Sequence, residues 1–312
     1  MKRQLIICGL LLCSIAACAQ NNHKARYERQ VKAVGVTGVG VETILDRWEE
    51  ETPEDPELLE ARFSWNFVKS QKSTVVQLDR TRYMGRKPVL SLNDSTSASG
   101  KKNYFEDTDY DPDYFKAATQ YINKAIRISP NELKYRFDKI SALLAYEKES
   151  PDMATDEIRT LIDYNASAAI PWTYNGEKTD EEFFKSAVQE YCFNFFSIGS
   201  EKSYESFHEI SEKMLSYYPK ETVFLDNIGS WWLIAQKNEA QAMKFYKKVL
   251  KINPKDYTAI KNMVIIARNG KDLKLEKKYL PKLIEVSPDE KERSAAQARL
   301  DGLGGTKARP AR

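Results

Sequence analysis

Apolar residues recur with helical spacing along the C-terminal half of the chain, in segments that end at regularly placed prolines. Between Tyr204 and Pro288 three such segments end at Pro219, Pro254 and Pro288, an interval of roughly 34 residues that is typical of helix–turn–helix repeats. A single helical hairpin cannot bury its own apolar face, so neighbouring hairpins must stack to form one core. The pattern therefore predicts an array of stacked helical hairpins.

The middle segment carries small and aromatic residues at defined places. Ile228 and Gly229 precede an aromatic residue at Trp232, and Ala242 precedes a second one at Tyr246. This pattern resembles the tetratricopeptide repeat, in which a Leu-Gly pair, an aromatic, and then Ala, an aromatic, Ala and Pro recur. The resemblance implies an all-α fold, a right-handed superhelical array of antiparallel helix hairpins in which small residues let helices cross closely.

The units on either side depart from this pattern. Phe207 and Glu276 stand where the middle unit has Ala242, so we expect the helices to lie further apart there. Pro281 falls inside the last predicted helix, where a proline removes a backbone hydrogen bond and kinks the chain.

The repeat domain is expected to cover residues 41–303. Residues 118–130 repeat the spacing of residues 242–254, including the closing proline. Two irregular insertions interrupt the array, at residues 72–111 and 165–179, and the first of them contains two short extended segments, 74–78 and 88–92. The predicted helical segments are a first hairpin over residues 41–71, then 111–130, 133–147, 153–164, 180–200 and, after Pro288, 291–303.

Residues 1–17 have the features of an export signal, a basic start followed by an apolar run too short to span a bilayer. The sequence Ile15-Ala16-Ala17-Cys18 resembles the lipobox of bacterial lipoproteins, which implies lipidation of Cys18. The alternative is cleavage before Gln20, which releases a soluble periplasmic protein. We favour the lipoprotein, and hence an exported protein attached to the outer membrane.

The two ends of the mature chain are expected to lie outside the core. Residues 18–40 are polar and then glycine-rich, which favours a flexible spacer, and residues 304–312 are expected to form a disordered basic tail. The acidic run that starts at Trp48 resembles exported bacterial proteins of this repeat family whose function is not known.

The overall charge is nearly balanced. The chain has 48 basic and 45 acidic residues, and this balance indicates no electrostatic surface for nucleic acid or for an anionic membrane. We therefore expect no nucleic-acid partner and contact with a membrane only through a lipid anchor. Cys192 lies in an aromatic segment and is interpreted as a small core residue rather than a nucleophile.

No set of residues for catalysis, metal binding or a cofactor is evident. The acidic run Glu106–Asp113 is similar to the start of a calcium loop but lacks the required Gly and Glu, so it is interpreted as the acidic opening of a helix. The two histidines, His23 and His208, have no second metal ligand at a useful spacing. An enzyme is therefore the least favoured class, and no cofactor is expected.

Clustered aromatic residues allow two interpretations. Trp231-Trp232 and Phe193, Phe195 and Phe196 cannot all face one side of their helices. Burial on two sides between stacked repeats is favoured, and an exposed platform for a glycan or a peptide is the alternative.

The resemblance also implies where a partner binds, because in this family the first helix of each hairpin lines the concave face. The positions carried over are Asp226, Asn227 and Ser230 in the middle unit, and Lys261, Asn262, Ile265 and Arg268 in the next. Lys261 and Arg268 lie two turns apart on one face and could hold an acidic peptide. The predicted function is a non-enzymatic scaffold that binds a protein or peptide in this groove, and the alternative is a glycan- or nutrient-binding lipoprotein.

Overall fold

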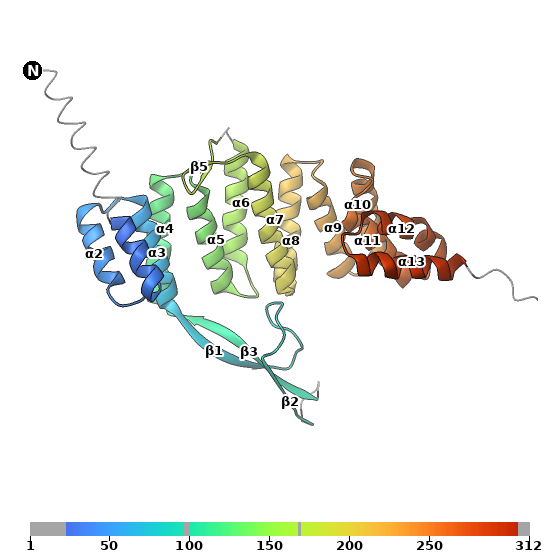
Figure 1. Cartoon of the computed structure of the whole chain (residues 1–312), viewed down its shortest axis with the longest axis horizontal. Helices are drawn as coiled ribbons and strands as arrows, with labels where there is room; N and C mark the ends of the chain where they lie inside the picture. The colour runs from blue at the N-terminus through green and yellow to red at the C-terminus, as the bar shows by residue number, and fades with distance from the viewer. Residues whose placement is uncertain (1–22, 97–99, 168–169, 305–312) are drawn as a thin grey trace, which may run out of the picture. The chain divides into compact units, whose positions relative to one another are not determined.

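Figure 1 shows the computed structural model of the chain, which describes residues 23–96, 100–167 and 170–304. The chain folds into two compact units that divide between Phe184 and Lys185, and each unit is described by itself. The predicted signal segment, Cys18 and the tail beyond Gly304 lie outside the described residues. None of the described helices combines the length and the apolar character needed to traverse a bilayer.

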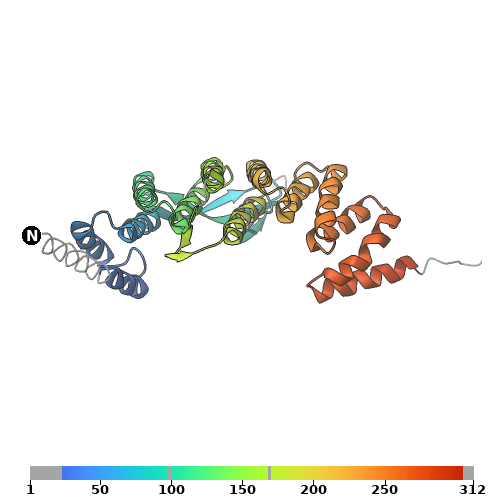
Figure 2. The ribbon, with the colours of Figure 1, turned by 90° about the horizontal axis from the view of Figure 1, so that it is seen from above.

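The N-terminal unit consists of helices, a three-stranded sheet and a two-stranded hairpin (Figure 1). A helix over residues 23–34 comes first. The elements that follow are α2 (Val41–Glu51), α3 (Pro56–Ser70), β1 (Gln71–Leu78), β2 (Leu90–Asn93), β3 (Lys101–Tyr110), α4 (Pro112–Ile128), α5 (Leu133–Glu147), α6 (Asp152–Ser167), β4 (Thr173–Tyr174) and β5 (Glu177–Lys178). Helices α3 to α6 are seen nearly end-on in Figure 2, as expected for stacked hairpins.

The helix over residues 23–34 differs from the flexible spacer that was expected for residues 18–40. His23, Tyr27 and Val31 recur every four residues, which places them on one side of this helix. Tyr27 and Val31 pack against the core of α2 and α3, and the imidazole Nε2 of His23 lies 2.9 Å from Glu51 Oε2. The segment is therefore the partner helix of α2. Its few apolar residues lie among many polar ones, so the sequence did not indicate a packed helix.

Helices α3 and α4 form one hairpin although residues 71–111 separate them. Strand β1 continues directly from α3 and pairs antiparallel with β3, from Gln71 opposite Tyr110 to Leu78 opposite Asn103. The amide of Asp111 donates to the carbonyl of Ser70 at 2.8 Å, so the pairing begins where the helices end. The extended segments expected at 74–78 and 88–92 correspond to β1 and β2, whereas β3 includes an acidic stretch that was interpreted as a helix start.

The sheet is fixed to the end of α5 by charged contacts. The Arg80 guanidinium forms two hydrogen bonds with the Glu149 carboxylate, at 2.8 and 2.9 Å, and the Lys148 ammonium lies 2.6 Å from Asp107 Oδ2. Tyr83 packs edge-on against buried Phe105 of β3. The first insertion is thus an ordered arm of the N-terminal unit.

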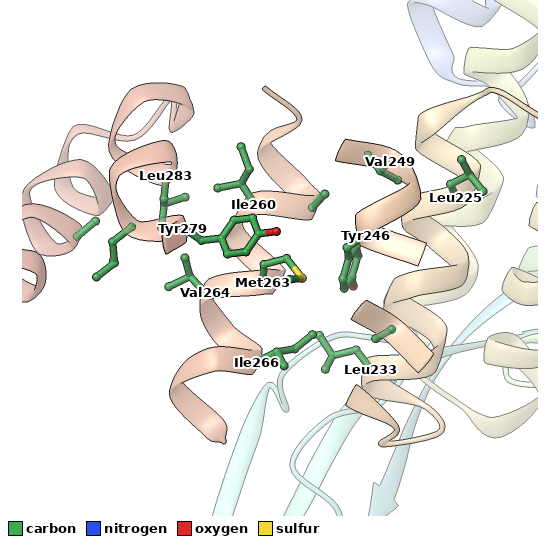
Figure 3. Packing of buried hydrophobic residues seen from close by; sticks show 14 of the residues in the cluster. Leu225, Leu233, Tyr246, Val249, Ile260, Met263, Val264, Ile266, Tyr279 and Leu283 are labelled. Atoms are coloured by element: carbon green, nitrogen blue, oxygen red, sulfur yellow. The ribbon is translucent and has the colours of Figure 1, made fainter. Parts of the chain in front are cut away.

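The C-terminal unit contains only helices among its described residues. Helix α7 (Glu181–Ile198) enters it, followed by α8 (Glu201–Tyr217), α9 (Thr222–Ile234), α10 (Glu239–Ile252), α11 (Tyr257–Asn269), α12 (Leu273–Val286) and α13 (Glu290–Gly304). Figure 3 shows its main core, in which Tyr246 of α10 and Met263 of α11 lie on facing sides of their helices. Helix α12 continues through the exposed Pro281.

The repeat alignment predicted the core positions correctly. Ala242, Tyr246 and Val249 are fully buried, and the residues at the matching places of α4, Ala118, Ile122 and Ala125, are buried as well. Gly229 is needed for this packing because an added Cβ would lie 2.6 Å from the Tyr246 ring. The architecture is a helical repeat array with two insertions.

Candidate functional site

The predicted groove residues of α9 lie mainly in the interior of the C-terminal unit. The Asn227 amide donates to Gln189 Oε1 at 2.8 Å and to Ser211 Oγ at 3.1 Å, which joins α7, α8 and α9. Ser230 is half-buried, and its hydroxyl lies 3.2 Å from the Tyr246 hydroxyl. These two side chains therefore hold the helices together and do not line an open groove.

Asp226 is only 5% exposed. Burial in the core, with the neighbouring Asp256 as a second cause, raises the pKa of its carboxyl to about 9. Asp256 also begins α11, where its Oδ1 accepts a hydrogen bond from the amide of Ala259 at 3.0 Å. At neutral pH Asp226 is consequently a protonated acid inside the fold and offers no charge to a ligand.

The predicted cations of α11 are bound by carboxylates of the same chain. The Lys261 ammonium lies 3.0 Å from Glu292 Oε1 and donates to the Tyr257 hydroxyl at 2.9 Å. The Arg268 guanidinium donates to Glu276 Oε1 at 2.9 Å. Asn262 is half-buried beside Lys261, and Ile265 is 37% exposed. An acidic peptide at Lys261 and Arg268 would have to compete with these internal partners.

The clustered aromatics mostly belong to the packing of the C-terminal unit. The Trp231 ring stacks on His208 with centroids 3.8 Å apart, and Trp232 meets Trp231 edge-on at 4.8 Å. Both indoles are half-buried. Phe195 is fully buried and Phe193 is 61% exposed. A single exposed ring does not make the flat platform considered for a glycan.

The structure instead places a cavity of about 570 Å³ in the N-terminal unit. It is lined mainly by three helices that each open a hairpin, namely the helix over residues 23–34, α3 and α5 with the turn before it. Trp48 of α2 and the β4–β5 hairpin complete the lining. The three helices are those that the family resemblance assigns to the binding face. The predicted groove residues, by contrast, lie in the other unit.

One carboxylate fixes the rim of this cavity. Glu132 is buried and accepts hydrogen bonds from the Thr173 hydroxyl at 2.8 Å and from the amides of Asn175 and Gly176 at 2.8 and 3.1 Å. The amide of Thr173 donates to the carbonyl of Asn131 at 2.9 Å. The second insertion is thereby held over the start of α5 as a fixed wall.

The other walls combine aromatic rings with both signs of charge. The Lys24 ammonium bonds to Glu57 at 2.5 Å, and the Lys134 ammonium bonds to Glu60 at 2.7 Å. Burial raises the pKa of the Tyr27 hydroxyl to about 12, so this side chain stays a neutral hydrogen-bonding group. Such a lining can hold the amides and mixed side chains of a peptide.

Sequence reasoning missed this cavity because five separate segments build it. One signal was present, since Glu132 is the second residue after Pro130, as Asp256 is after Pro254, and such acids cap the helix that follows. The extra role of Glu132 in binding the β4–β5 hairpin depends on an insertion found in one repeat only.

The acidic run Glu106–Asp113 does not form a calcium loop. Glu106 to Tyr110 belong to β3, and Asp111 caps α4 by accepting hydrogen bonds from the amides of Asp113 and Tyr114. Within the described ranges, His, Cys, Asp and Glu side chains nowhere gather in a group of three or more that could hold a metal ion. Cys192 is buried, and burial raises its pKa to about 12, so its thiol stays protonated.

Comparisons with known proteins find one repeat family and a similar solved structure. A family model described as the tetratricopeptide repeat matches residues 230–256. A solved structure described as a functional characterization of Pseudomonas aeruginosa pilF is similar at a TM-score of 0.40 and 15% identity, covering 61% of this chain and 76% of that chain. No curated protein matches. Helical repeats of this kind form a non-catalytic class of interaction scaffold. The resemblance to the tetratricopeptide repeat is confirmed over residues 230–256, and the chain is a helical repeat protein.

Proposed function

We propose that the chain is a non-enzymatic scaffold that binds a protein or peptide through the cavity of its N-terminal unit. The observation that carries this proposal is the position of the cavity on the first helices of three consecutive hairpins. Its volume falls within the range of about 300–1,000 Å³ that is usual for ligand pockets, which leaves room for a few residues of an extended peptide. The Glu132-bound hairpin keeps the site preformed, which lowers the entropic cost of binding.

Site-specific cross-linking tests this function. A photo-reactive residue is placed at the exposed rim position Asn175, and a matched one at Thr160, which is exposed on α6 and does not line the cavity. After irradiation in cells, we expect protein adducts at residue 175 and none at residue 160. Equal adducts at both positions, or none at residue 175, would contradict a protein-binding cavity. Glycan adducts at residue 175 would favour the glycan-binding lipoprotein instead.

We further propose that the scaffold is exported and tethered through Cys18 to the outer membrane. The support is the lipobox-like sequence around Cys18. Cys18→Ala should release the protein into the soluble periplasmic fraction or leave an unprocessed precursor. A mature wild-type chain that begins at Gln20 would show that the anchor does not exist.

A further inference from the structure

Two helices of the C-terminal unit each carry a row of lysines along one side. The rows are Lys244, Lys247, Lys248 and Lys251 on α10, and Lys274, Lys277, Lys278 and Lys282 on α12. Intervals of three and four residues bring the members of each row to the same side of the helix. All of them are exposed except Lys282, which is half-buried. These eight residues are called the lysine face below.

The two rows lie on the same side of the unit. Lys244 and Lys278 occupy the same place relative to the proline that closes their repeats, and so do Lys248 and Lys282. Stacked repeats present equivalent positions on one surface. Helices α10 and α12 both pack against α11, which agrees with this arrangement (Figure 1).

Neighbouring acids do not neutralise the lysine face. Residues 239–286 include twelve basic and only five acidic residues. Of these acids, Glu276 binds Arg268, Asp256 caps α11, and Glu285 lies 2.7 Å from Lys255. None of the eight lysines forms an ion pair with a residue that the structure describes. Like charges four residues apart destabilise a helix, so helix stability does not account for the rows.

Charge is distributed unevenly between the two units. Residues 185–312 have 23 basic and 16 acidic residues, whereas residues 1–184 have 25 and 29. The near-zero net charge of the whole chain therefore hides a basic C-terminal unit and an acidic N-terminal unit. The argument against an anionic membrane surface, which rested on the net charge of the whole chain, does not apply to the C-terminal unit alone. Asymmetry of this kind is typical of chains in which one part meets an anionic surface.

We propose that the lysine face binds the surface of a bilayer that contains anionic phospholipids. Ammonium groups on flexible stems act as point charges and need no fixed arrangement of phosphates. Each row also has an exposed apolar neighbour four residues from one of its lysines, Leu273 on α12 at 52% exposure and Ile252 on α10 at 47%. Such side chains enter the interfacial layer of a membrane.

The same surface is poorly suited to the recognition of nucleic-acid bases. Stacking of bases requires exposed aromatic rings, but Phe245 is half-buried under Lys248, whose Nζ lies 4.6 Å from the ring centroid. Tyr279 on α12 is buried. The lysine face contains no arginine, which is the residue that forms paired hydrogen bonds with phosphates and base edges.

Vesicle co-sedimentation tests the proposal. The chain is produced from Ala19 onward so that no acyl anchor contributes, and is mixed at low salt with phosphatidylcholine vesicles that contain or lack phosphatidylglycerol. We expect binding only when phosphatidylglycerol is present. Each lysine near an anionic surface strengthens binding about fivefold, so Lys→Gln at 244, 248, 274 and 278 should lower the partition coefficient on the order of several hundredfold.

A matched variant removes the same number of charges elsewhere. Arg26, Arg29, Lys32 and Arg47 are exposed helical residues of the N-terminal unit, and changing all four to Gln should leave binding within about twofold of the wild type. Circular dichroism confirms that both variants fold. The proposal is wrong if phosphatidylglycerol does not increase binding of the wild type to the vesicles, or if both variants lose binding equally. It is also wrong if the chain binds duplex DNA but not the vesicles at the same salt concentration.

Discussion

The protonated carboxyl of Asp226 leads to a prediction about pH and stability. In the folded chain its pKa is about 9, because the side chain is buried and lies beside Asp256. In the unfolded chain the pKa is close to the ordinary value of 3.8. Between these two values the folded state keeps a proton that the unfolded state has lost. The free energy of unfolding therefore falls as the pH rises through this window, by about 1.4 kcal/mol per unit.

The variant Asp226→Asn removes this dependence while keeping the shape of the side chain. Its amide can still donate a hydrogen bond to Asp256. From pH 6 to pH 8 the stability of the variant relative to the wild type should increase by about 3 kcal/mol. The wild type should be the less stable of the two at the upper end of the range, since keeping the buried carboxyl protonated costs more free energy as the pH rises.

Urea denaturation followed by tryptophan fluorescence measures this difference, because Trp231 and Trp232 lie in the same helix as Asp226. The control is Asp301→Asn, which changes an exposed carboxylate of the same unit. Its stability relative to the wild type should not depend on pH. If the difference between Asp226→Asn and the wild type stays constant from pH 6 to pH 8, the carboxyl is not protonated in the fold and the argument fails.

Three further substitutions test the packing of the C-terminal unit, each by thermal denaturation. Gly229→Ala should lower stability by roughly 1–3 kcal/mol, since its Cβ would press on the Tyr246 ring, and an unchanged midpoint would mean that the ring moves freely. Ala242→Leu should destabilise by a similar amount because the site is fully buried, and no effect would remove it from the core. Glu276→Gln should cost about 2 kcal/mol at neutral pH, because charge-assisted hydrogen bonds from Arg299 are weakened. Arg299 lowers the pKa of Glu276 from its ordinary value of 4.5, so the wild type should lose this advantage as the pH falls below that value, and equal losses in both proteins would contradict the role of the ion pair.

The repeat period predicted most of the core because each repeat places its residues in the same environment. Ala118 and Ala242 are far apart in sequence, yet both are buried where two helices cross. The same logic failed for residues 23–34, where only His23, Tyr27 and Val31 mark the buried side of a polar helix. The composition of this helix does not reveal so few apolar residues, although they are enough for the helix to pack on Trp48.

The binding residues could not be predicted in the same way. Family positions indicate which face of a helix to examine, but they do not show whether a side chain already has a partner. Lys261 and Arg268 find theirs in Glu292 and Glu276, which belong to other helices. The cavity of the N-terminal unit depends on an insertion in one repeat. The repeat period cannot predict an element that occurs only once.

The pairing of β1 with β3 also bears on how the N-terminal unit folds. The turn between α9 and α10 spans residues 235–238, whereas residues 71–111 separate α3 from α4. Closing a connection about ten times longer costs on the order of 2 kcal/mol more in chain entropy. Gln71 lies opposite Tyr110, where α3 ends and α4 is about to begin. Pairing of β1 with β3 that starts far from the helices and extends toward them would therefore bring α3 and α4 together. We therefore expect the sheet to form early in the folding of its hairpin, so that mutations in β1 slow folding of the N-terminal unit more than they speed its unfolding, as stopped-flow kinetics would measure.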